Sequence, residues 1–304
     1  MDSDLRIVFM GTPEFAVASL DILVKNNYKI VGVITAPDKP AGRGKQLKES
    51  AIKKYALAHQ LPLLQPEKLK NPEFIAELKA LNADLQIVVA FRMLPEIVWS
   101  MPPLGTFNLH GSLLPQYRGA APINWAIING EKETGVSTFF LQQEIDTGNL
   151  IFQDKTTISD DDNAGSIHDK LMDLGAQLVL KTVRAIENKS VQGQKQSELG
   201  AEKIAPKIFK EDCEINWEND ADKIQNFIRG LSPFPTAFTK LNGQQLKIFS
   251  SKICENELKL KQGEFKIDKS ILVGTNTHPI ELLEIQLEGK KRMLAKEFLL
   301  GYRN

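Results

Sequence analysis

The stretch Leu5-Arg6-Ile7-Val8-Phe9-Met10-Gly11-Thr12-Pro13 begins the first regular element of the chain. Its apolar run has the length of a buried strand, and glycine and proline end it. Thr12 is suited to cap a following helix, and Pro13 is suited to its first position. The sequence therefore opens with a strand that turns into a helix.

The same alternation continues through the first half of the chain. Further strands are expected at residues 28–35, 85–90, 136–142 and 151–158, and helices at residues 50–59, 71–81 and 166–187. Buried strands alternating with helices are typical of a mostly parallel sheet covered on both faces, a doubly wound, Rossmann-like α/β fold. Such sheets bind ligands beyond the carboxyl ends of their strands, so Asn108 and the loop after Ala90 are expected at that edge.

The composition changes after residue 188. Residues 188–203 are polar with little periodicity, which is typical of a linker. Short strands then recur at residues 238–241, 246–249, 271–273 and 280–285, separated by turn signals. This pattern predicts a small antiparallel β-barrel of the OB type. We therefore expect a catalytic domain at 1–188, a linker at 189–205 and a barrel domain at 206–304.

Composition excludes few functions. The 304 residues carry 38 Lys+Arg and 38 Asp+Glu, so net charge argues neither for nor against a nucleic-acid partner. The two cysteines, Cys213 and Cys254, have no CxxC spacing, which favours reduced thiols in a cytoplasmic protein. No apolar run reaches the roughly 18 residues of a membrane span. We expect a cytoplasmic protein.

Asn108, His110 and Asp146 are the candidate catalytic residues. Asn108 and His110 alternate, so on a strand end both side chains point to the same face. An amide beside an imidazole suits a reaction that builds negative charge on a carbonyl oxygen, and a carboxylate can orient the imidazole and favour its protonated form. This set indicates acyl or formyl transfer without a covalent nucleophile.

Each of these residues also has an ordinary structural interpretation. His110 alone would suit a structural histidine, and Asp146 alone a turn aspartate. The four histidines show no metal-ligand spacing and no HExxH, so zinc is disfavoured. The chain has no GxSxG elbow for a serine nucleophile and no GxGxxG for a dinucleotide.

Basic residues gather between the second strand and the first predicted helix after it. Residues 39–54 hold six basic residues and one acid, a net charge of +5, and Arg43 is flanked by glycines. The sequence favours a mobile loop that contacts a polyanion, against the alternative of a solvated basic face. Lys207, Lys210 and residues 290–292 add possible phosphate contacts in the C-terminal part.

Five motifs connect these features: residues 9–16 (FMGTPEFA), 37–45 (PDKPAGRGK), 108–115 (NLHGSLLP), 117–122 (YRGAAP) and 144–148 (EIDTG). With them the chain resembles the methionyl-tRNA formyltransferase family, one branch of the folate-dependent formyltransferases. Residues 229–237 (RGLSPFPTA) depart from the family's usual pattern, which has tryptophan between the two prolines where this chain has Phe234.

The resemblance implies that the formyl group of 10-formyltetrahydrofolate passes to the methionine amino group of initiator methionyl-tRNA, in translation initiation. Because the sequence has no metal-ligand cluster and no flavin or nicotinamide fingerprint, we expect no metal and no cofactor beyond the folate donor, and we expect a monomer. The implied catalytic residues are Asn108, His110 and Asp146. The implied folate-binding residues are Ser112, Leu113, Leu114, Pro115, Arg92 and Met93, and the implied tRNA-binding residues are Lys39, Arg43, Lys45 and Lys207. Two alternatives remain: an amino-sugar nucleotide as the acceptor, or a tRNA-binding protein without catalysis.

Overall fold

The computed structural model describes residues 4–41, 46–144, 146–196, 203–255 and 258–301. Its contacts divide the chain into two compact units. The first comprises Met1–Arg118, Gly135–Thr156 and Asp169–Lys203, and the second comprises Gly119–Thr134, Thr157–His168 and Ile204–Asn304. Two segments of the N-terminal half therefore group with the C-terminal chain, and the linear domain limits given above stay a prediction.

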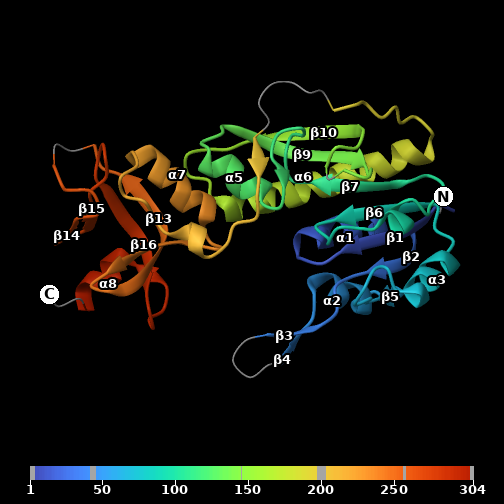
Figure 1. Cartoon of the computed structure of the whole chain (residues 1–304), viewed down its shortest axis with the longest axis horizontal. Helices are drawn as coiled ribbons and strands as arrows, with labels where there is room; N and C mark the ends of the chain where they lie inside the picture. Colours follow the sequence, from blue (N-terminus) through green and yellow to red (C-terminus); the bar gives the residue numbers. More distant parts are fainter. Residues whose placement is uncertain (1–3, 42–45, 145, 197–202, 256–257, 302–304) are drawn as a thin grey trace. The chain divides into compact units, whose positions relative to one another are not determined.

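The first unit is built on a seven-stranded sheet (Figure 1). Its strands, in spatial order, are β10 (Leu150–Thr157), β9 (Glu133–Phe140), β7 (Thr106–His110), β6 (Leu85–Val89), β1 (Arg6–Gly11), β2 (Lys29–Ile34) and β5 (Leu63–Leu64). The pairs from β7 to β5 are parallel, while β9 runs antiparallel to β7. The expected mostly parallel α/β fold is confirmed.

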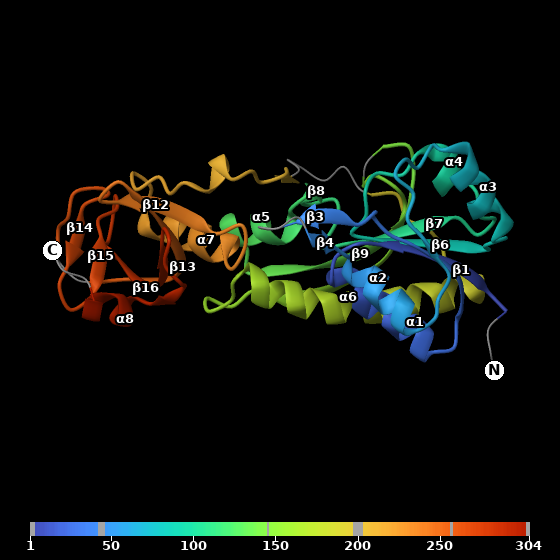
Figure 2. The same cartoon turned by 90° about the horizontal axis from the view of Figure 1, so that it is seen from below.

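Helices cover both faces of this sheet (Figure 2). They are α1 (Phe15–Lys25), α2 (Ala51–Ala58), α3 (Pro72–Ala80), α4 (Glu96–Trp99) and α6 (Ala164–Glu187). On the α3 face, Val8 and Met10 of β1 and Val88 of β6 form one buried cluster with Phe74 and Leu78 of α3. Burial of these alternate strand residues is the main force that holds α3 on the sheet.

Leu109 of β7 faces the opposite side, against α6. A Cβ placed on Gly175 of α6 would come within 2.7 Å of Leu109 Cδ2, so the helix approaches the strand as closely as a glycine allows. Because neighbours on a strand point to opposite faces, Asn108 and His110 project to the α3 face of the sheet. The hydrogen bond from the Thr106 hydroxyl to the carbonyl oxygen of Trp99 in α4 agrees with this orientation.

The start of α1 differs from the prediction. Thr12 does not cap this helix, whose N-cap is Glu14 and has no side-chain cap hydrogen bond. A tight turn comes first, in which Ala16 N donates to the carbonyl of Pro13. Prediction is correct at α3, where the Asn71 side chain accepts from Glu73 N and Pro72 is the first helical residue.

The basic segment after β2 is partly regular structure, where we expected a loop. β3 (Lys39–Ala41) and β4 (Gln46–Lys48) form an antiparallel hairpin, in which Lys39 pairs with Lys48. Arg43 and Lys45 lie outside the described residues. Lys53 of α2 forms an ion pair with Asp38 at the base of the hairpin, and this hydrogen bond lowers the pKa of Asp38.

The second unit is built on a six-stranded antiparallel sheet. Five strands are neighbours in the order β12 (Ala237–Leu241), β13 (Gln244–Ile253), β16 (Ile280–Leu287), β15 (Ile271–Val273) and β14 (Phe265–Ile267), and β17 (Met293–Leu294) pairs with β16. Within the described residues no ladder joins β12 to β14, so the sheet forms a half-barrel. The expected antiparallel C-terminal fold is confirmed in this open form.

Helices complete the second unit. Its helices are α5 (Pro122–Ile128), the 3₁₀ turn η1 (Glu211–Cys213), α7 (Ala221–Leu231) and α8 (Ala295–Gly301), and the short strands β8 (Arg118–Gly119) and β11 (Ile204–Ala205) pair beside α5. Gly230 of α7 lies against Ile128 of α5, where an added Cβ would be 2.6 Å from Ile128 Cγ1. The Asn124 side chain donates to the carbonyl of Gly230 at 2.8 Å, which joins α5 to α7.

A buried arginine joins α7 to the segment that precedes α6. Arg229 is 9% exposed, and its guanidinium donates to the carbonyls of Ser159 at 2.9 Å and Asp162 at 3.1 Å. Burial lowers the pKa of Arg229. This cation holds residues 157–168 in the second unit.

Candidate functional site

The candidate site lies at the carboxyl end of β7. Asn108 and His110 lie on the same face of this strand, and Thr138 and Ser137 of β9 flank it on the antiparallel side. The Asn108 side chain is half-buried, and its amide has no hydrogen-bond partner among the described residues. An unused amide donor and an imidazole therefore share one face at this end of the strand.

The two ring nitrogens of His110 face different partners. Nε2 lies 2.9 Å from the carbonyl oxygen of Tyr117, which can only accept, so Nε2 carries a hydrogen. Nδ1 lies 3.8 Å from Oδ2 of Asp146. That separation is an ion-pair contact beyond hydrogen-bond length. Both side chains are almost closed off from solvent, with 8% of His110 and 11% of Asp146 exposed.

Asp146 occupies a constrained turn after β9. Its φ of 56° is in the left-handed region, which a residue with a side chain adopts only when its surroundings hold it there. A Cβ on Gly148 would lie 1.6 Å from the carbonyl oxygen of Phe140, so only glycine fits there. Phe140 N donates to the carbonyl of Asn149 at 3.0 Å, which closes the turn. The turn returns the chain tightly and directs Asp146 toward β7.

The residues expected to bind folate lie in two loops of the first unit. In the loop after β7, Ser112 is fully buried and its hydroxyl donates to the carbonyl of Gln116 at 2.6 Å. Leu114 is buried, its N–H donates to the Ser137 hydroxyl, and its carbonyl accepts from Gln153. These contacts fix the backbone of the loop, and Leu113 and Pro115 remain partly exposed on it.

The second loop follows β6 and contains Arg92 and Met93. The Arg92 guanidinium donates to the carbonyls of Glu67 and Pro66, and burial lowers its pKa. Its buried Nε has no hydrogen-bond partner among the residues that the structure describes. Met93 is 73% exposed, an unusual position for a large apolar side chain. The exposed Met93 side chain offers apolar surface of the kind that suits a flat ligand.

The residues expected to bind tRNA fall in both units of the chain. Lys39 is exposed in β3 of the first unit, and Arg43 and Lys45 are outside the described residues. Lys207 belongs to the second unit, where its ammonium lies 5.0 Å from the centre of the Phe209 ring.

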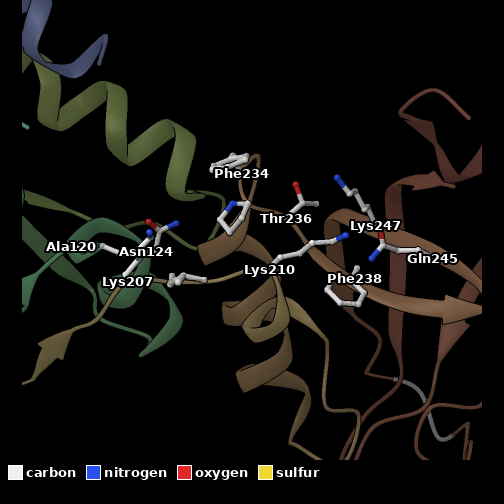
Figure 3. A pocket seen from close by; sticks show the side chains of 12 residues that line it. Ala120, Asn124, Lys207, Lys210, Phe234, Thr236, Phe238, Gln245 and Lys247 are labelled. Carbon is white, nitrogen blue, oxygen red and sulfur yellow. The ribbon is translucent and has the colours of Figure 1, made fainter. Parts of the chain in front are cut away.

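Lys207 also lines a cleft of about 430 Å³ within the second unit (Figure 3). Its lining residues are Ala120, Ala121, Asn124, Lys207, Ile208, Lys210, Phe234, Pro235, Thr236, Phe238, Gln245 and Lys247. Three of these are lysines and none is acidic. Phe234 is 80% exposed, and Phe238 pairs across the strands with Lys247. Cations beside exposed rings are suited to phosphates and bases.

Comparison with known protein families matches two regions of the chain. The Formyl transferase family matches residues 5–183, and the Formyl transferase C-terminal domain matches residues 207–303. The chain belongs to the formyl transferase family. Its curated relatives include the methionyl-tRNA formyltransferases of Azobacteroides pseudotrichonymphae, at 55% identity over 98% of this chain and 96% of the relative, and of Bacteroides fragilis, at 54% identity over 98% and 95%.

Solved structures share the fold of this formyl transferase at low identity. HypX from Aquifex aeolicus in complex with tetrahydrofolic acid matches with a TM-score of 0.66 and 21% identity, over 98% of this chain and 47% of that chain. The sugar 3N-formyl transferase WlaRD matches with a TM-score of 0.68 and 22% identity, over 95% and 100%. This formyl transferase has no helix, among those described, that is long and apolar enough to cross a bilayer.

Sequence reasoning missed one group of residues that the structure brings to the site. Gln196 lies in the segment expected to be a linker, yet its side chain contacts the Asp146 turn. Its neighbours Gln194 and Lys195 have the same polar character, so no sequence signal distinguishes it. In the separate cleft of the second unit, Lys247 was also missed, because a lysine on a strand is ordinary in sequence.

Proposed function

We propose that the chain transfers the formyl group of 10-formyltetrahydrofolate to the methionine amino group of initiator methionyl-tRNA. The observation that carries the proposal is the juxtaposition of His110 and Asp146, 3.8 Å apart, on the face of β7 that also presents the unpaired Asn108 amide. Relatives of this name at 54–55% identity support the choice of acceptor. Charged tRNA is a cytoplasmic molecule, so the proposed activity places the chain in the cytoplasm. All three side chains come from one chain, so a monomer suffices.

In this proposal the folate supplies the formyl carbon and three side chains handle charge and protons. The Asn108 amide donates to the carbonyl oxygen as that oxygen gains negative charge. The Tyr117 carbonyl occupies Nε2 of His110, so Nδ1 is the second donor to this oxygen. Preorganised donors of this type contribute about 100- to 1000-fold each. Asp146 stabilises the charged ring and accepts the proton that the attacking amine releases. The bond from the formyl carbon to the folate nitrogen then breaks, and that nitrogen takes up a proton and leaves as tetrahydrofolate.

The loops at the sheet edge are the proposed folate site. Leu113, Pro115 and Met93 offer apolar surface, while the backbone near Arg92 and Ser112 offers polar contacts. The Ser112 hydroxyl already bonds to Gln116, so its part is to hold the loop. The chain's residues fit a flat, partly polar ring system because they combine an exposed thioether with a rigid turn.

Two basic surfaces are the proposed acceptor contacts. Lys39 is in β3, and Arg43 and Lys45 come between β3 and β4 in the sequence, outside the described residues. The second surface is the lysine-lined cleft that contains Lys207 (Figure 3). Phosphate contacts from lysine and arginine supply affinity that falls steeply as salt rises.

The deciding experiment offers two acceptors to one preparation. Charged initiator tRNA and an amino-sugar nucleotide are each incubated with 10-formyltetrahydrofolate, and the formylated product is quantified. We expect formylation of the tRNA, and we expect Asn108→Ala and His110→Ala each to lower its rate by about 100- to 1000-fold. Formylation of the sugar nucleotide alone, or tRNA binding with no product, would replace the proposal by one of the two alternatives.

The basic hairpin has its own test. Arg43→Ala should weaken the use of tRNA and leave hydrolysis of the formylfolate unchanged, because the proposed contact is with the acceptor. Equal loss of both activities would assign this residue to the folate site.

A further inference from the structure

The segment expected to be a passive linker contacts the catalytic turn. We infer that Gln196, held by Arg118, is a positioning residue that fixes the Asp146 carboxylate opposite His110. This inference rests on the proposed function of that pair. It assigns to the connecting segment a part in the reaction, which neither the family motifs nor the catalytic residues themselves indicate.

The Gln196 side chain bonds the turn at two points. Its Nε2 donates to the carbonyl of Asp146 at 2.7 Å and to the carbonyl of Gly148 at 2.9 Å. Asp146 has a φ of 56°, a conformation unfavourable for a residue with a side chain. Two hydrogen bonds to the backbone on either side of Thr147 are the type of restraint that keeps such a turn in place.

Arg118 determines which way the Gln196 amide points. The Arg118 guanidinium donates to Gln196 Oε1 from Nε at 3.1 Å and from Nη2 at 2.6 Å. Its Nε also lies 3.1 Å from the Asp146 carbonyl oxygen. Because a guanidinium only donates, the amide oxygen must face Arg118 and the amide NH₂ must face the turn. Both hydrogens and the oxygen of Gln196 are therefore in use.

The restraint acts on catalysis through the backbone of Asp146. Side-chain contacts of Gln196, as the described part of the chain shows them, are with Arg118 and the two turn carbonyls. A displaced carbonyl at Asp146 rotates its side chain, and the carboxylate then leaves its place 3.8 Å from His110 Nδ1. Gln196 consequently controls the rate without contacting a reacting atom.

The same connecting segment also holds the other side of the histidine. Lys203 accepts at its carbonyl from Tyr117 N at 2.5 Å, and its own N–H donates to the Gln116 side chain at 2.9 Å. Tyr117 in turn accepts from His110 Nε2. The two ends of the segment thus restrain both partners of the imidazole ring.

The test compares Gln196→Met and Gln196→Glu with the full-length parent. Methionine keeps the length of the side chain and removes both donors, while glutamate can still bond Arg118 but has no hydrogen for the turn. We expect each to lower kcat for methionyl-tRNA formylation by about tenfold, with KM for either substrate within about twofold of the parent. Gln194→Met is the matched control, because Gln194 is exposed on the same segment and bonds Leu150 through its backbone alone. It should match the parent.

A second background separates positioning from simple stabilisation. In Asp146→Asn, where the carboxylate is already absent, Gln196→Met should change kcat by less than about twofold, since coupled residues act non-additively. An undiminished tenfold loss in that background, or parental kcat in both Gln196 variants, overturns the inference. Inactivity of the parent itself toward methionyl-tRNA would instead refute the proposed function. Melting temperatures confirm that each variant is folded.

Discussion

Replacing Asp146 by asparagine removes one charge from the candidate site and keeps the shape of the side chain. In the proposed mechanism His110 is protonated as the oxyanion forms. Its charge and that of the Asp146 carboxylate, 3.8 Å apart, then interact by about 1 kcal/mol in bulk water and by about 4 kcal/mol at an effective dielectric constant of about 20. The pair is almost closed off from solvent, so the upper part of this interval applies. At about 1.4 kcal/mol per factor of ten, we expect kcat to fall by about 100- to 1000-fold.

The assay is single-turnover formylation of methionyl-tRNA, with enzyme in excess over tRNA and saturating 10-formyltetrahydrofolate. These conditions report the chemical step rather than product release. Glu77→Gln is the control, because Glu77 is an exposed carboxylate on α3 of the same unit. Glu77→Gln also removes one negative charge, at a position distant in sequence from Asp146. It should react at the parental rate.

We expect the rate to fall because Asp146→Asn removes the carboxylate charge, and one result would contradict this reason. A rate within threefold of the parent, in a variant with unchanged circular dichroism and folate affinity, would mean that the carboxylate does not stabilise a charged His110. The ion-pair reasoning would then be wrong, whatever the activity of the parent.

Three further predictions concern stability. Gly175→Val should destabilise the protein by about 1–3 kcal/mol and slow turnover, because the new side chain overlaps Leu109 on the catalytic strand; urea unfolding and formylation rates check this. Arg229→Ala should cost about 3 kcal/mol in urea unfolding, since it leaves two carbonyls without a charged donor. Asp38→Asn should lower the melting temperature at pH 7, because the native ion pair with Lys53 lowers the pKa of Asp38. This difference should begin to shrink as pH falls below about 3.9, the unfolded-state pKa of Asp, and vanish only below the lowered native pKa.

Each of these stability predictions has an opposite outcome. Parental stability of Gly175→Val would show that α6 can move away from β7 without cost. Parental stability of Arg229→Ala would mean that solvent replaces the guanidinium. A difference for Asp38→Asn that persists in acid would assign its effect to shape and not to charge.

The sequence correctly predicted those strands and helices whose first and last residues themselves carry a boundary signal. β1 is an unbroken apolar run, and α3 begins with a capping asparagine and a proline at its first position. The start of α1 was mispredicted because a tight turn at Pro13 displaces the helix beyond the reach of Thr12. A helix N-cap depends on one hydrogen bond from a backbone N–H to a side chain, and the sequence does not show which side chain accepts it.

Other elements depend on contacts that are distant in sequence. α7 was not predicted, and its last turn is held by contacts distant in sequence. Gly230 packs against α5, and Arg229 bonds the carbonyls of Ser159 and Asp162. The hairpin β3–β4 was also missed, since its two short strands contain no apolar alternation.

The residues of the candidate site were chosen for the chemistry of their side chains more than for a sequence pattern. Asn108 and His110 share a face because they alternate on a strand, which sequence shows directly. Asp146 was included because an imidazole needs a partner, and the structure brings the two together. Gln196 was beyond reach, since its part depends on the backbone conformation of a turn 50 residues earlier in the chain.

The division of the chain into two units has a practical consequence for recombining members of this family. α5 packs against α7, and Arg229 bonds residues near Ser159, so pieces of the N-terminal half complete the C-terminal fold. A hybrid that exchanges two homologues at residue 206 would bring together surfaces that never adapted to each other. Exchange of residues 119–134 and 157–168 along with the C-terminal chain would keep each set of packed neighbours from a single parent.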